Sequence, residues 1–198
     1  MNTQKSQFNR NLLIILVVLF VLTIATLSIV EWVASSGDAP LWAMLLNVPI
    51  LAIPLVLLYG SIYVLVVGWR EHTTFKQVSP RLAKIIHWAP RVAAILIIFF
   101  ISLFSLDVFE MQATPLELLG GFLMHNIPSI AMLVLLIFAW KRPVVGFVAF
   151  LTTAAAFTFF FVRSIYNLQN LIFFVLPILL VASLFYADWK WLRPRLPA

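Results

Sequence analysis

The chain has 198 residues, of which 64% are apolar and only 10% are charged, and its mean hydropathy is +1.08. A soluble domain keeps roughly a quarter of its residues charged and under half of them apolar, so this composition excludes a soluble fold and predicts a chain embedded in lipid. The net charge of +6 comes from basic residues in short connections between apolar runs. That placement favours topology signals and anionic-lipid contacts over nucleic-acid binding. The lack of cysteine excludes a disulfide framework and thiolate metal sites.

Six apolar runs are each long enough to cross a membrane as a helix. A helix rises about 1.5 Å per residue, so about 20 residues cross a hydrocarbon core of about 30 Å. The runs lack the apolar/polar alternation of an outer-membrane barrel, so strands are not expected. The sequence therefore predicts an all-α, polytopic membrane helical bundle that forms one unit over residues 1–198. The predicted spans are residues 11–33, 41–69, 91–109, 116–140, 144–162 and 168–189.

Lysine and arginine resist translocation, so their placement predicts how the chain is threaded. With both termini cytoplasmic, twelve of the thirteen basic residues fall in inner segments and only Arg163 falls outside. The acids sort the other way, with Glu71 and Asp188 as the two inner exceptions. The sequence thus predicts a multi-pass protein of the cell (cytoplasmic) membrane with both termini on the cytoplasmic side.

The second span is long for a simple crossing and carries Pro49 and Pro54, so we expect it to tilt or kink. Asn47-Val-Pro49 in this span and Asn126-Ile-Pro128 in the fourth are both Asn-x-Pro motifs in the outer part of the span. They suggest three related helical hairpins, formed by spans one and two, three and four, and five and six.

The connection between the second and third spans is the longest. Ser79-Pro80 is typical of a helix start, and apolar residues then recur at helical spacing with Arg81 and Lys84 between them. We expect an amphipathic helix over residues 79–89 that lies on the inner leaflet, with Pro90 separating it from the third span. The basic residues expected to contact anionic lipid at the inner face are Arg70, Lys76, Arg81, Lys84 and Arg91.

Polar residues within the spans gather toward the outer ends. Ionisable groups at membrane depth are costly and often functional, so these residues are candidates for a functional site. Asp107 and Glu110 are three residues apart, hence on one helical face, and Arg163 is their expected partner. One interpretation is an ion pair that locks spans three and five. The other is a site for a cationic or polar ligand, or for proton movement. The candidate outer polar cluster consists of Asp107, Glu110, His125, Asn126, Arg163 and Asn47.

His125 lies about ten residues into the fourth span, roughly 10–15 Å below the outer surface on helix-rise arithmetic. With Asp107 or Glu110 it could form a carboxylate–imidazole pair. The alternative is a structural histidine beside Asn126 that helps to bridge helices around the Pro128 kink. No metal site or other cofactor is expected, because three ligands with recognisable spacing are missing.

The stretch from Arg91 to Phe161 carries a resemblance to a known family. Its phrases are S-L-F-S-L-D-V-F, which contains Asp107, and H-N-I-P, which contains His125 and Pro128. This stretch resembles a family of small prokaryotic multi-pass membrane proteins known only as a domain of unknown function. The resemblance implies a bacterial or archaeal cytoplasmic membrane and assigns no activity.

The main functional hypothesis is a non-enzymatic accessory or ligand-sensing bundle served by the outer polar cluster. It rests on that cluster and on the lack of nucleophile motifs such as G-x-S-x-G. Two alternatives stay open: a small transporter or channel subunit, and a lipid-modifying enzyme that uses His125 with Asp107. The expected partner is membrane lipid rather than nucleic acid, and a homo-oligomer or a membrane-protein partner is left open.

Overall fold

The computed structural model describes residues 2–34, 41–110, 112–162 and 171–192, and the side chains of residues 2–5, 31, 34, 41–51 and 110 are outside this description. Every regular element in the described ranges is helical, with no strand. The elements are α1 (Asn2–Ala34), α2 (Leu41–Phe75), α3 (Pro80–Leu103), the 3-10 helix η1 (Phe104–Glu110), α4 (Pro115–Ala139), α5 (Pro143–Phe161), the π-helical η2 (Leu171–Val175) and α7 (Leu176–Trp191).

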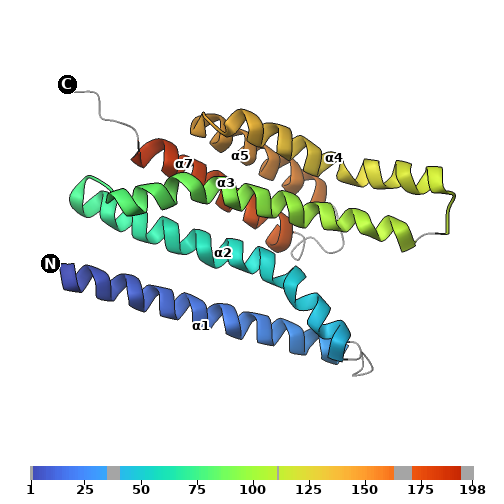
Figure 1. Cartoon of the computed structure of the whole chain (residues 1–198), viewed down its shortest axis with the longest axis horizontal. Coiled ribbons are helices and arrows are strands. Elements are labelled where there is room, and N and C mark those ends of the chain that lie inside the picture. Colours follow the sequence, from blue (N-terminus) through green and yellow to red (C-terminus); the bar gives the residue numbers. More distant parts are fainter. Residues whose placement is uncertain (1, 35–40, 111, 163–170, 193–198) are drawn as a thin grey trace.

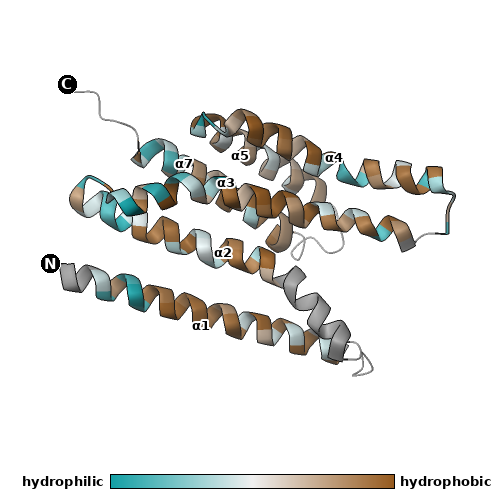
Figure 2. Cartoon of the chain, in the orientation of Figure 1, coloured by the Kyte–Doolittle hydropathy of each residue, from teal (hydrophilic) through white to brown (hydrophobic). Residues whose placement is uncertain are grey.

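The predicted all-α architecture is confirmed, since six helices in the described ranges are long and apolar enough to cross a membrane. Successive helices run in opposite directions, so α1 begins and α7 ends at the same end of the bundle (Figure 1). We call this the basic end, and Figure 2 shows hydrophilic residues gathered there while the middle of the bundle is apolar. Its basic residues whose side chains are described are Arg10, Arg70, Lys76, Arg81, Lys84, Arg91, Lys141, Arg142 and Lys190. The other end is called the opposite end.

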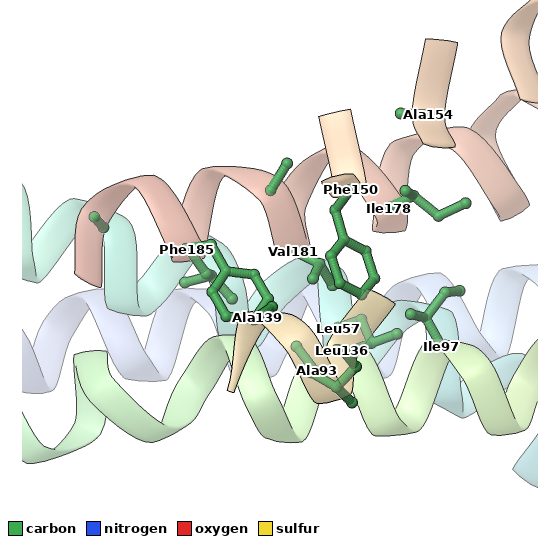
Figure 3. Packing of buried hydrophobic residues seen from close by; sticks show 14 of the residues in the cluster. Leu57, Ala93, Ile97, Leu136, Ala139, Phe150, Ala154, Ile178, Val181 and Phe185 are labelled. Carbon is green, nitrogen blue, oxygen red and sulfur yellow. The ribbon is translucent and has the colours of Figure 1, made fainter. Parts of the chain in front are cut away.

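Helix α7 is the centre of the bundle and α1 is its edge. Half of the residues in the most apolar stretch of η2 and α7 are buried, against 6% in that of α1. The reason is that α7 packs on α2, α3 and α5, while α1 packs chiefly on α2. The core contains fully buried Ile97, Phe150 and Ile178 from three helices (Figure 3). Lipid is as apolar as these side chains, so van der Waals packing rather than burial from water holds such helices together.

Helices α5 and α7 approach each other closely in this core. Phe185 of α7 is fully buried and stacks on Phe150, with ring centroids 5.6 Å apart. A Cβ atom added at Gly146 of α5 would lie 2.6 Å from the Phe185 ring. Gly146 therefore sets the distance between the two helices, because any larger residue would displace a fully enclosed ring.

Prolines bend one helix and leave another continuous. Figure 1 shows α2 bent in its first part, where Pro49 and Pro54 fall, as the sequence predicts. The expected break at Pro90 is wrong: α3 runs through this residue from Pro80 to Leu103. Pro90, Leu82 and Ile86 are buried, so packing against the bundle keeps the first turns of α3 in line with the span.

Candidate functional site

A buried ion pair joins α3 to α7 at the basic end. Arg91 on α3 is 1% exposed and Asp188 on α7 is 4% exposed. The Arg91 guanidinium donates through Nη1 to Asp188 Oδ2 over 2.7 Å. The prediction that Arg91 contacts lipid headgroups is therefore wrong, because the side chain turns into the bundle toward a carboxylate 97 residues away in the chain.

The remaining Arg91 donors bind backbone carbonyls. Nε and Nη2 both donate to the carbonyl of Trp140, the C-cap of α4, over 3.3 and 2.8 Å, and Nη1 also donates to the carbonyl of His87. A guanidinium has five N–H donors, and four hydrogen bonds to protein groups account for most of them. Arg91 thus ties together α3, the end of α4 and α7.

The Arg91–His87 bond lies beside Pro90 inside α3. Proline has no N–H, so the carbonyl of Ile86, four residues earlier, loses its helical donor. The Arg91 guanidinium donates to the next carbonyl, that of His87. The side chain after the proline thus binds the turn that contains it, but it does not replace the hydrogen bond lost at Ile86.

His87 is the exposed member of this group, with 48% of its side chain accessible. Its Nδ1 lies 3.4 Å from Asp188 Oδ1, so the carboxylate faces a guanidinium on one oxygen and an imidazole on the other. Beside it, the partly exposed Trp88 and Trp140 rings meet edge to face with centroids 6.2 Å apart. We call Arg91, Asp188, His87 and the Trp140 carbonyl the Arg91 cluster. Tryptophans beside it are typical of a membrane–water interface.

A second buried carboxylate lies at the same end. Glu71 of α2 is 5% exposed and accepts a 2.9 Å hydrogen bond from the backbone N–H of Ser79. Ser79 is the N-cap of α3 but makes no side-chain cap of its own. Glu71 therefore binds an otherwise unsatisfied N–H group at the start of α3 and connects this helix to α2.

The other predicted lipid-contact residues have mixed surroundings. Lys76, Arg81 and Lys84 are exposed, as lipid contact requires, and their contact with headgroups stays a prediction. Arg70 is partly buried, and its guanidinium carbon lies 3.9 Å from the ring centroid of Phe8 on α1.

The predicted outer polar cluster is only partly described. Asp107 in η1 and His125 in α4 are both exposed, and no hydrogen bond between them occurs among the described residues. His125 Nδ1 lies 2.9 Å from the carbonyl of Gly121, and buried Asn126 donates to the carbonyl of Phe122 over 3.0 Å. Both side chains therefore bind their own helix. Arg163 and the side chains of Asn47 and Glu110 lie outside the described residues, so the full cluster stays a prediction.

The opposite end is organised by apolar packing and a helix cap. A Cβ atom at Gly121 of α4 would lie 2.8 Å from the Val108 side chain, so η1 and α4 approach closely. Thr114 and Glu117 form a capping box at the start of α4, with Glu117 accepting from the backbone N–H of Thr114 over 2.9 Å. Among the described residues, no group of three His, Asp or Glu side chains is placed to hold a metal ion.

Asp188 and His87 are site residues that the sequence did not predict, although one signal for Asp188 was present. Glu71 and Asp188 are the two acids that violate the sorting of charge between the sides of the membrane. Both prove to be buried and hydrogen-bonded. An acid that remains among basic residues at the end of an apolar span therefore indicates a structural partner rather than a topology signal.

The six apolar helices, with hydrophilic residues at the ends of the bundle, define an α-helical multi-pass membrane protein. The chain belongs to the family described as Domain of unknown function (DUF7670), whose model matches residues 79–197. The match extends the resemblance noted for Arg91–Phe161 in both directions. It begins at the N-cap of α3, includes the whole Arg91 cluster and leaves α1 and α2 outside. No curated protein and no solved structure matches the chain.

Proposed function

We propose that this protein is a non-enzymatic accessory bundle of a prokaryotic cytoplasmic membrane, with both termini on the cytoplasmic side. In this role the region from α3 to α7 is a rigid body held by the Arg91 cluster, and the surfaces of the bundle contact lipid and a membrane-protein partner. The observation that carries the proposal is that most hydrogen-bond donors of the Arg91 guanidinium are already used. Its bonds to Asp188, His87 and Trp140 leave little capacity to bind a substrate.

The distribution of buried polar groups favours an accessory role over transport. The buried charged residues of the described chain are Glu71, Arg91 and Asp188, all at the basic end. The other buried polar residues of the described chain are uncharged: Ser61, Ser105, Asn126 and Ser129. A path for an ion through the bundle needs polar groups at successive depths, and between the two ends these single uncharged side chains lie among an apolar core.

The proposed orientation can be measured directly, because the chain has no cysteine and single cysteines need no further background changes. Gln77 and Gln112 are exposed at the basic and opposite ends. A membrane-impermeant maleimide should label Gln112→Cys in intact cells, and Gln77→Cys only after permeabilisation. The reverse pattern would overturn the orientation.

Flux assays test the choice between accessory bundle and transporter. The purified protein in liposomes under an imposed membrane potential should give no proton or potassium flux above that of empty liposomes. In native membranes, chemical cross-linking should join the chain to one membrane protein in a fixed ratio. Protein-dependent flux that disappears in Asp188→Asn would overturn the accessory role and identify the Arg91 cluster as part of a transport path.

Ligand sensing at the opposite end is a second candidate. It is supported by the exposure of Asp107 close to the α3–α4 connection, and by the presence of His125 at a depth in α4 where a polar side chain is costly. If this candidate holds, replacing both residues with alanine should leave the melting temperature unchanged and abolish the response of the cross-linked partner to its stimulus. An unchanged response would exclude it.

A further inference from the structure

An open apolar groove of about 230 Å³ lies between α1 and α2. It is bounded on α1 by residues from Leu13 to Phe20 and on α2 by residues from Val56 to Tyr63. Seven residues of helix rise make it roughly 10 Å long. Toward the opposite end, the Tyr59 hydroxyl forms a 2.8 Å hydrogen bond with the Thr23 hydroxyl, which links the two helices beyond the groove.

A second groove, of about 180 Å³, lies on the other side of α2, against α3 and α7. Val56 and Gly60 line both grooves, so the two hollows adjoin along one ridge of α2 and lie at the same depth. Gly60 keeps this ridge low, since a Cβ atom there would meet nothing within 4 Å. Two adjoining apolar grooves on either side of one ridge offer places for part of each acyl chain of one phospholipid.

The walls of the first groove continue into arginines at the basic end. Arg10 lies three residues before Leu13 and seven before Val17, so these residues share one face of α1. Arg70 lies seven residues after Tyr63, on the corresponding face of α2. On helix-rise arithmetic both arginines are within about 10 Å of the groove.

Arg70 also has unused hydrogen-bonding capacity. Its guanidinium lies against the Phe8 ring, Nη1 is enclosed without a hydrogen-bond partner, and the residue as a whole is partly exposed, so a phosphate would be bound through the other guanidinium nitrogens. No carboxylate of the described residues forms an ion pair with it. Arginine binds phosphate through charge-assisted hydrogen bonds, so this residue is suited to an anionic headgroup.

We propose that the α1–α2 hairpin binds one anionic diacyl phospholipid, with its acyl chains in the two grooves beside Gly60 and its phosphate against Arg70 and Arg10. The lipid fills the hollows that separate α2 from α1 and from α3. It thereby acts as a structural ligand that fixes the hairpin to the region from α3 to α7. This proposal goes beyond the accessory role and does not depend on it.

Lipid binding by the full-length protein in detergent tests the proposal. Dioleoyl phosphatidylglycerol and dioleoyl phosphatidylcholine are titrated separately, and bound lipid is counted by native mass spectrometry. One phosphatidylglycerol should remain bound at least about tenfold more tightly than phosphatidylcholine, because a charged hydrogen-bonded contact is worth that factor or more. Equal affinity for the two lipids would overturn the proposal.

Two variants locate the site. Gly60→Leu places a side chain between the grooves and should lower phosphatidylglycerol affinity at least about tenfold, since several methylene contacts are lost. Its matched control is Gly120→Leu on α4, where a Cβ atom also meets nothing within 4 Å, and this variant should bind as the wild type does. Equal binding by the two variants would overturn the assignment to these grooves.

The arginines provide a test that does not depend on the glycine variant folding. Arg70→Gln should reduce the preference for phosphatidylglycerol over phosphatidylcholine while leaving weak binding of both lipids. Lys141→Gln, at an exposed basic residue between α4 and α5, is the control and should keep the preference. Loss of preference in the control alone would place the headgroup elsewhere and contradict the proposal.

Discussion

The two ends of the bundle use polar residues in different ways. At the basic end, Arg91, Asp188 and Glu71 are buried and their bonds connect different helices. At the opposite end, His125 and Asn126 bind carbonyls of their own helix, and Asp107 is exposed. A bond between helices restricts how the bundle is assembled, whereas a bond within one helix would survive if the helices separated. Among the described residues, the buried charged contacts between helices lie at the basic end, whereas the Thr23–Tyr59 hydroxyl pair that joins α1 to α2 is uncharged.

The largest effect is expected for Asp188→Ala. This change leaves the Arg91 guanidinium buried beside Phe185 without its counter-ion. Breaking a buried ion pair on one side costs about 3–5 kcal/mol, so the variant should unfold at a much lower denaturant concentration in detergent micelles. Asp107→Ala, which removes an exposed acid at the other end, is the matched control. Equal stability of the two variants would remove the distinction between the ends.

A smaller loss is expected for Glu71→Ala. The change removes the acceptor for the Ser79 N–H group, and an unsatisfied buried donor costs about 1–3 kcal/mol. Glu71→Gln keeps an acceptor oxygen and should recover part of this loss. Amide hydrogen exchange at the start of α3 should rise in Glu71→Ala more than in Glu71→Gln. No change in exchange there would contradict the capping role of Glu71.

At the opposite end, Thr114→Ala should have a local effect. Thr114 accepts from the Glu117 backbone N–H at the start of α4, and loss of such a cap costs about 1 kcal/mol. The faster hydrogen exchange should be confined to the first turn of α4. Faster exchange in α5 or α7 would show that this end also holds the helices together.

The smallest effect is expected for His125→Ala. The ring is exposed and its described hydrogen bond is to Gly121 in the same helix, so the change in unfolding free energy should stay within about 0.5 kcal/mol. A loss as large as that of Asp188→Ala would mean that His125 has a partner in another helix. The predicted outer cluster would then be a real site.

The helices were predictable from sequence because each span is determined by its own composition. Continuous apolar runs and the sorting of basic residues require no knowledge of which helices pack together. Pro90 is the exception, since the proline predicts a break, but α3 continues through it with Leu82, Ile86 and Pro90 buried against the bundle.

The Arg91 cluster was not predictable as a site, because its main bond joins residues 97 positions apart. One sequence does not determine which helices are neighbours, and the depth of Arg91 in the bundle follows from that packing. The reasoning that grouped Asp107 with His125 used depth alone, and the structure places both on the surface. Depth along a span is readable from sequence, whereas the face that a side chain occupies is not.

The most direct test of the account is a double-mutant cycle on the ion pair between α3 and α7. Arg91→Met and Asp188→Leu should each destabilise the protein strongly, since each leaves one buried charge or its carbonyl partners unsatisfied. The double variant should be more stable than the sum of the two single losses predicts, by at least about 2 kcal/mol. Strictly additive losses would contradict the account, because they would show that Arg91 and Asp188 stabilise the bundle independently of each other.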